Sequence, residues 1–193
     1  MAESGAFRLG SSFSLRQDTF FSHTRYALKF RKVVFGFALS AALLQGCYSS
    51  RGNSCFPAGT KVQTPTGEIN VESVKVGDEV LGFDFATGKT VAVHVTQTHI
   101  HHFDAKLKKL TLSDGATLEV TPEHPLYSET RLGFVKAGEL VAGEQLKVLD
   151  GDRKVQALEI GSVADESNND DVYNLETDTT KNYFVAGILA KYY

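Results

Sequence analysis

A fourteen-residue pattern that appears in two places, without a gap, is the feature that most constrains the fold of this chain. Residues 71–84 (VESVKVGDEVLGFD) align with residues 137–150 (AGELVAGEQLKVLD) at an offset of 66 positions. The aligned pairs include a glycine, an aspartate and apolar residues spaced for a turn followed by a strand. A match of this length indicates duplication of one β-subdomain, so we expect two halves of similar plan.

The chain after residue 60 alternates between strand-like runs and turn sequences. The runs are short and rich in Val, Leu, Thr and aromatic residues, as strands are. The turns, such as PTGE, ATGK, SDGA and LDGD, contain glycine and aspartate. No segment keeps a 3.6-residue apolar period. The sequence therefore predicts an all-β domain.

The basic and acidic residues are divided unevenly along the 193 residues of the chain. Residues 1–47 contain 6 Lys/Arg against 2 Asp/Glu, which leaves 14 against 21 for residues 48–193. The second part is mildly acidic and has no basic stripe, so we expect no nucleic-acid partner. Its densest acidic run lacks the regular ligand spacing of a calcium-binding loop, and a solvated loop is the simpler interpretation. The run comprises Asp165, Glu166, Asn168, Asn169, Asp170 and Asp171.

Residues 1–47 have the order of an export signal. A basic cluster at residues 29–32 precedes a twelve-residue apolar run at 33–44. That run fits the ~7–15 residues of a signal-peptide core and falls short of the ~20 needed to span a bilayer. The sequence LQGC, ending at Cys47, resembles the bacterial lipobox, which implies a lipidated cysteine at the new N-terminus. An ordinary cleaved signal and an uncleaved anchor remain the alternatives.

Four histidines invite a metal hypothesis. Strand alternation puts at most two of them on one face, and the sequence offers no accompanying thiolate or nearby carboxylate pattern. We therefore expect ordinary strand residues, with no metal and no cofactor. The four are His94, His99, His101 and His102.

Cys55 is the first residue of the predicted domain. If Cys47 is lipidated, Cys55 becomes a lone thiol outside the cytoplasm, where structural cysteines normally pair; a small buried hydrophobe is the alternative. A thiol at this position can reach the carbonyl of Ser54, which permits an N-to-S acyl shift. Such a shift needs a strained peptide bond, oxyanion donors and an acid for the leaving amine. Thr121 and His124, in a Thr-x-x-His-Pro turn, are candidates for these roles. The alternative is that the turn is only a rigid connection between strands.

Three ordered segments resemble the Hint module that inteins, bacterial intein-like domains, pretoxin-type domains and hedgehog autoprocessing domains share. They are CFPAGTKVQTPTGEINVESVKVGDEVLGFD, LTLSDGATLEVTPEHPLYS and VYNLETDTTKNYFVAGIL. The resemblance implies a horseshoe-like, all-β fold with a pseudo-two-fold axis. It also implies that Cys55 is the nucleophile, and that Thr121 and His124 bind and protonate the scissile amide.

Several positions depart from the pattern of this family. Lys191 and Tyr192 stand where splicing inteins have histidine and asparagine, and a tyrosine cannot form a succinimide. Because the sequence also ends at Tyr193, we expect no splicing. Asn174 stands where many members have aspartate, and Lys181 where many have histidine. An asparagine side chain can donate and accept hydrogen bonds but cannot transfer a proton. The resemblance therefore implies that the acyl shift is slowed.

The sequence thus predicts three parts: residues 1–47 as signal, 48–54 as a polar tether, and 55–193 as a Hint domain in the bacterial cell envelope. The leading hypothesis is self-cleavage at Ser54–Cys55, with water or an external thiol or amine resolving the thioester and freeing the domain from its membrane anchor. One alternative is an inactive Hint-fold lipoprotein that binds a partner or serves a structural role. Another is transfer of the anchor peptide to an amine of a second protein. The oligomeric state is not indicated.

Overall fold

The computed structural model describes residues 54–192, which are built almost entirely from strands and confirm the all-β prediction. No helix in this part of the chain is long and apolar enough to cross a membrane. The strands are β1 (Phe56–Pro57), β2 (Lys61–Thr64), β3 (Gly67–Asn70), β4 (Glu79–Asp84), β5 (Lys89–Leu112), β6 (Thr117–Val120), β7 (Pro125–Ser128), β8 (Gly133–Lys136), β9 (Gln145–Leu149), β10 (Val155–Thr177), β11 (Asn182–Val185) and β12 (Ile188–Lys191), with 3₁₀ turns η1 (Val71–Ser73) and η2 (Ala137–Glu139).

The duplication is visible residue by residue. β3, η1, β4 and β5 each begin 66 positions before β8, η2, β9 and β10. The turn between the 3₁₀ element and the strand needs a glycine in both copies, because Gly77 has φ +93° and Gly143 has φ +91°. That region is strained for residues with a Cβ. The repeat in the sequence is therefore a repeat of local structure.

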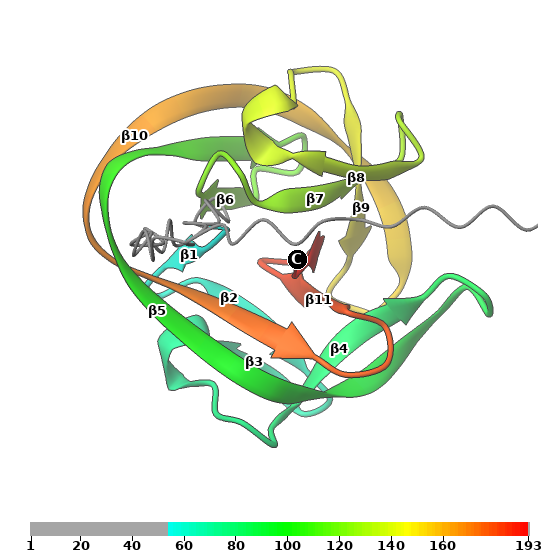
Figure 1. Cartoon of the computed structure of the whole chain (residues 1–193). Helices are drawn as coiled ribbons and strands as arrows, with labels where there is room; N and C mark the ends of the chain where they lie inside the picture. Colours follow the sequence, from blue (N-terminus) through cyan, green and yellow to red (C-terminus); the bar gives the residue numbers. More distant parts are fainter. Residues whose placement is uncertain (1–53, 193) are drawn as a thin grey trace, which may run out of the picture. The chain divides into compact units, whose positions relative to one another are not determined.

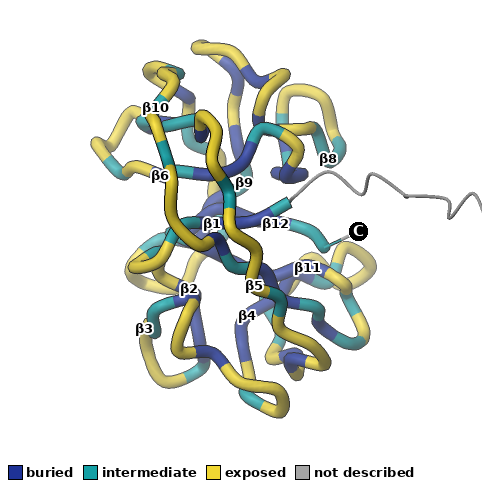
Figure 2. The backbone as a smooth tube through the Cα atoms, turned by 60° about the vertical axis from the view of Figure 1, so that its left-hand side comes forward, coloured by how far each residue is buried: buried dark blue, intermediate teal, exposed yellow. Residues whose placement is uncertain are grey.

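The two longest strands hold the halves together. β5 and β10 pair antiparallel from Thr177 to Ile160, and each also pairs with the short strand that precedes it, β4 or β9. Figure 1 shows these two ribbons curving together around the shorter strands. Along the sheet the order is β3-β2-β11-β12-β7-β9-β10-β5-β4, so β11 and β12 bring the C-terminal segment between the halves. Figure 2 shows β1 and β12 between an upper and a lower group of strands.

The prediction of a solvated loop for the acidic run is wrong, because residues 165–171 lie within β10. They pair with residues 108–102 of β5, and Lys108 and the adjacent Lys109 form ion pairs with the first two acidic side chains. Lys108 contacts Asp165 at 2.7 Å, and Lys109 contacts Glu166 at 3.6 Å. Pairing with a neighbouring strand can override a weak local strand preference, which explains the difference.

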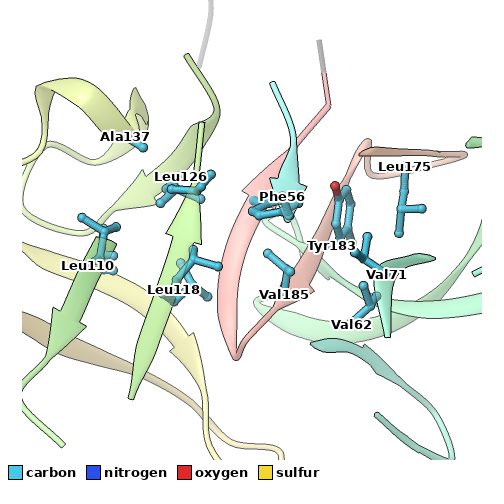
Figure 3. Close-up of a cluster of buried hydrophobic side chains, with 14 of the residues drawn as sticks. Phe56, Val62, Val71, Leu110, Leu118, Leu126, Ala137, Leu175, Tyr183 and Val185 are labelled. Carbon is cyan, nitrogen blue, oxygen red and sulfur yellow. The ribbon is translucent and has the colours of Figure 1, made fainter. Parts of the chain in front are cut away.

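β1 is fixed by one aromatic anchor. Phe56 is fully buried within a core cluster to which both halves contribute. Figure 3 shows it among Leu118 and Leu126 from one side and Tyr183 and Val185 from another. Burying a phenylalanine side chain stabilises a fold by about 1.5–3 kcal/mol. This burial holds the residue next to Cys55 in a fixed position.

Candidate active site

The Ser54–Cys55 peptide lies immediately before β1, and one residue holds Cys55. The backbone N–H of Cys55 donates to Thr121 Oγ1 at 2.8 Å, and the backbone N–H of Thr121 donates to the Cys55 carbonyl at 3.0 Å. The two residues are 66 positions apart, so they are equivalent positions of the duplicated halves. The nitrogen of the Ser54–Cys55 bond is therefore in direct contact with the threonine that the sequence predicts.

A tight turn contains Thr121 and His124. Hydrogen bonds from η2, in the second copy of the repeat, hold this turn in place. The N–H of His124 donates to the Thr121 carbonyl at 3.1 Å, which closes the turn. From η2, the N–H groups of Ala137 and Gly138 donate to the carbonyls of His124 and Pro122, both at 2.8 Å. The hydroxyl of Ser54 also donates to the Glu123 carbonyl at 3.3 Å. The duplicated segment thus holds the turn, and the turn itself contacts Ser54.

Replacing Gly138 with alanine is expected to destabilise this turn. A Cβ there would lie 3.1 Å from Pro122 Cβ and 3.2 Å from the Pro122 carbonyl oxygen. Because both neighbours belong to a rigid prolyl unit, the turn must move, at a cost of about 1–3 kcal/mol typical of overpacking. Urea unfolding measures the loss. Gly151→Ala is the matched control, since its Cβ would have no neighbour within 4 Å. Equal midpoints for the two variants would contradict the prediction.

His124 is a neutral imidazole in a closed environment. Its side chain is fully buried, and its ring packs against the Phe56 ring with centroids 4.2 Å apart. Within residues 54–192 neither ring nitrogen makes a hydrogen bond of ordinary geometry. Burial lowers the pKa of His124 to about 3, although the adjacent Ser54 backbone opposes that effect. A buried imidazole with unused nitrogens is uncommon, and this one lies beside the Ser54 backbone.

The Cys55 side chain is also buried. The residue is 2% exposed, and burial raises the pKa of the thiol to about 12. Burial alone agrees with the interpretation of Cys55 as a small hydrophobe. The contacts of its backbone with Thr121 add a second feature that a core cysteine does not need. The thiol is protonated at neutral pH, so any attack by it requires transfer of its proton.

Asn174 lies in β10, close to the start of β1. It is buried, and its Oδ1 accepts hydrogen bonds from the Leu175 N–H at 2.8 Å and the Tyr183 hydroxyl at 2.7 Å. Sequence reasoning did not single out Tyr183. Its place depends on the register of β11 against the other strands, for which the sequence has no local signal.

The positions that depart from the splicing pattern have other contacts. The Tyr192 ring stacks on His99 with centroids 5.6 Å apart, and His99 Nε2 lies 2.7 Å from a Glu176 carboxylate oxygen. The Lys191 ammonium lies 5.4 Å from the Phe134 ring centroid. Lys181 is exposed in the turn after β10, with φ +53°. Tyr192 and Lys191 therefore contribute ring and cation contacts at the end of β12.

The four histidines lie in β5, and three of them have carboxylate neighbours that the local sequence does not show. His94 contacts Glu79 at 3.7 Å and Asp178 at 3.5 Å, and His102 contacts Asp171 at 3.4 Å. These partners come from β4, β10 and the turn after it, so strand pairing creates a proximity that the local sequence does not contain. Among residues 54–192 no group of three or more potential ligands gathers at one point.

Comparisons with solved structures define the class of the protein. A bacterial intein-like domain from Clostridium thermocellum superposes with a TM-score of 0.64 at 28% identity, over 72% of this chain and 98% of that one. A DnaB intein from Synechocystis sp. PCC 6803 gives a TM-score of 0.65 at 13% identity, over 72% of this chain and 99% of that one, which supports the fold alone. The domain is therefore a Hint-type, intein-like module. The chain belongs to the pretoxin HINT domain family, whose model matches residues 61–192.

Two curated relatives share parts of the chain. Warthog protein 1 from Caenorhabditis elegans is 27% identical over 106 residues, which is 53% of this chain and 22% of that protein. An iron–sulfur cluster assembly SufBD family protein from Mycobacterium tuberculosis is 34% identical over 89 residues, 45% of this chain and 10% of that protein. The chain thus matches about a fifth or less of the length of these relatives. The family model begins after Cys55, so this residue lies just outside the matched range.

Proposed function

We propose that the domain cleaves its own Ser54–Cys55 peptide bond through an N-to-S acyl shift, without splicing. One observation carries the proposal: Thr121 binds the scissile nitrogen at 2.8 Å while the buried His124 ring lies beside the Ser54 backbone. Membership of the Hint and intein-like autoprocessing class agrees with this chemistry.

The chemistry balances within the site. The Cys55 sulfur attacks the Ser54 carbonyl carbon, the carbon–nitrogen bond breaks, and a thioester and the free α-amine of Cys55 form. The thiol gives up one proton and the departing nitrogen gains one. We assign both transfers to His124: the neutral ring takes up the thiol proton at one nitrogen and gives a proton to the departing nitrogen from the other, since both ring nitrogens are unused and the ring lies beside the Ser54 backbone.

We assign Thr121 the binding of the scissile N–H but not the stabilisation of the oxyanion. Its hydroxyl oxygen accepts from the scissile N–H, and its backbone N–H donates to the carbonyl of Cys55 itself. The oxyanion forms on Ser54 instead, so Thr121 fixes the plane of the scissile peptide and does not donate to the oxyanion in this arrangement. The group beside the Ser54 backbone is His124.

The outcome that we propose is release from a membrane. If Cys47 carries lipid, residues 47–54 form a tether of at most roughly 25–29 Å, and cleavage after Ser54 separates the domain from its anchor. Water or an external thiol or amine then resolves the thioester. The proposed location is the bacterial cell envelope, facing away from the cytoplasm.

Incubation of the purified full-length chain with and without a small thiol tests the proposal. We expect a fragment that begins at Cys55 to appear in intact-mass measurements, and to appear faster when the thiol intercepts the thioester. The Cys55→Ala chain, which has no nucleophile, is the control and should remain whole. If the unaltered chain keeps its full-length mass under both conditions, the inactive binding or structural module is the better description. A product joined to an added amine would favour peptide transfer.

A further inference from the structure

The hairpin that precedes the 3₁₀ turn is longer in the second copy of the repeat than in the first. β2 and β3 are separated by residues 65–66, whereas β7 and β8 are separated by residues 129–132. β7 begins directly after His124, and β8 ends directly before η2. The longer hairpin therefore connects His124 with η2, and its turn contains an arginine, Arg131.

Arg131 joins this hairpin turn to η2. One guanidinium nitrogen, Nη2, donates to the carbonyl of Glu139, the last residue of η2, at 2.9 Å, and also to the carboxylate of Glu144. Glu144 is 7% exposed, so its carboxylate is a nearly buried charge that needs a partner. The Ser128 hydroxyl and the Val141 N–H each donate to the same carboxylate at 3.3 Å. The arginine therefore bridges a buried anion and the end of η2.

The first copy of the repeat shows what is specific to this arrangement. Asp78 stands 66 positions before Glu144, and its carboxylate accepts from the Lys75 N–H at 2.8 Å. Glu144 accepts in the same way from the N–H of the residue three positions before it. Asp78 is only partly buried, and the turn between β2 and β3 contains no basic residue. The backbone contact is thus common to both copies, and the arginine bridge is found in the copy that contains η2.

η2 in turn fixes the turn that contains His124. The N–H groups of Ala137 and Gly138 donate to carbonyls of that turn, both at 2.8 Å. Burial of Ala137 and Leu140 also holds η2, but apolar contacts have no direction, whereas hydrogen bonds at both ends of a short element fix its orientation. Orientation matters here, because displacement of a catalytic group by about 1 Å can slow a reaction by about 10²-fold.

We propose that Arg131 is a positioning residue for the cleavage reaction: by joining Glu144 to the end of η2, it holds the turn that contains His124. The inference rests on the proposed function for its purpose. The arrangement also has its own observable, because the amide protons of Ala137 and Gly138 exchange with solvent when η2 separates from that turn.

Hydrogen exchange tests the arrangement in the full-length chain carrying Cys55→Ala, which has no nucleophile for cleavage. We expect Arg131→Met to speed the exchange of the Ala137 and Gly138 amides by about tenfold. The physical reason is that methionine fills similar space but donates to neither the end of η2 nor the buried carboxylate. The exchange rates are measured residue by residue by NMR.

Two controls separate positioning from a general loss of stability. The Val71 amide donates to the Thr60 carbonyl at 2.8 Å and occupies in η1 the place that Ala137 occupies in η2, so its exchange should not change. Arg153→Met removes an exposed arginine from the turn between β9 and β10 and should leave both amides unchanged. Removing one partner of a buried ion pair can prevent folding. If Arg131→Met does not fold, Arg131→Met/Glu144→Met replaces it, because this double variant leaves no unpaired charge.

Cleavage rates provide the second test, and His124→Gln shows through which residue Arg131 acts. We expect Arg131→Met to slow cleavage by about ten- to hundredfold. It should have no further effect beside His124→Gln, because both changes act on one group. Equal exchange in Arg131→Met and Arg153→Met, or an equal rise at Val71, would overturn the positioning role. A parental cleavage rate in Arg131→Met, or a further loss beside His124→Gln, would overturn it as well. If the parent chain does not cleave but exchange responds as expected, only the proposed function fails.

Discussion

Replacing His124 with glutamine is expected to slow cleavage of the Ser54–Cys55 bond by about 10²- to 10⁴-fold, the usual contribution of a positioned acid or base. Glutamine keeps a polar side chain of similar reach, but it cannot deliver a proton to the departing nitrogen. The structure makes the loss specific, because the ring lies beside the Ser54 backbone and has no other hydrogen-bond partner among residues 54–192. The rate is measured from the growth of the Cys55-initiated fragment by intact mass.

His102→Gln provides the matched control for this experiment. Its imidazole is largely exposed on β5 and contacts Asp171 at 3.4 Å, so the same substitution removes a histidine without touching the scissile peptide. We expect its cleavage rate to equal that of the parent chain. An equal rate in His124→Gln as well would show that the leaving amine obtains its proton from solvent, and the assignment of His124 would have to be withdrawn.

The parts of the fold that the sequence could predict depend on local pattern. The duplication is recorded by matched glycines and apolar positions, since a turn with positive φ requires glycine in both copies, as at Gly77 and Gly143. The aligned repeat does not extend to Cys55 and Thr121, and their equivalence becomes visible only in the structure, where the Cys55 N–H donates to Thr121 Oγ1. Features set by neighbouring residues, such as a turn that requires glycine, can therefore be predicted from the sequence.

The parts that could not be predicted depend on which strands meet. The acidic run resembles a loop by composition, and only pairing with the lysines of β5 makes it a strand. Tyr183 is an ordinary strand residue in the sequence and becomes a partner of Asn174 only through sheet register. Long-range register, rather than residue type, decided each of these cases.

The free energy of unfolding is expected to fall by up to about 5 kcal/mol as the pH drops from 6.5 to 3, through His124 alone. The histidine has its ordinary pKa of 6.5 when unfolded, and burial lowers that pKa to about 3 in the folded protein. Between these values the unfolded state binds a proton that the folded state rejects. Stability therefore rises with pH across this window: the contribution is fully present above pH 6.5 and lost progressively on acidification.

Urea unfolding at a series of pH values measures this loss, with Cys55→Ala as the parent so that no cleavage intervenes. The comparison is Cys55→Ala with Cys55→Ala/His124→Gln. Carboxyl groups whose pKa values the fold lowers, such as Asp84 and Asp165, also reduce stability in acid. They do so equally in both chains and cancel in the difference. We expect the parent to lose stability more steeply below pH 6.5, and the double variant to lose it only where carboxyl groups titrate.

Parallel curves would mean that His124 takes up its proton as readily in the folded protein as in the unfolded one. The ring would then be hydrated or hydrogen-bonded in solution, and not enclosed against Phe56. That result would bear on catalysis as well. An imidazole that is neutral until the scissile nitrogen becomes basic can hold and deliver a single proton inside the site. An imidazole already in exchange with solvent would leave the timing of that transfer uncontrolled.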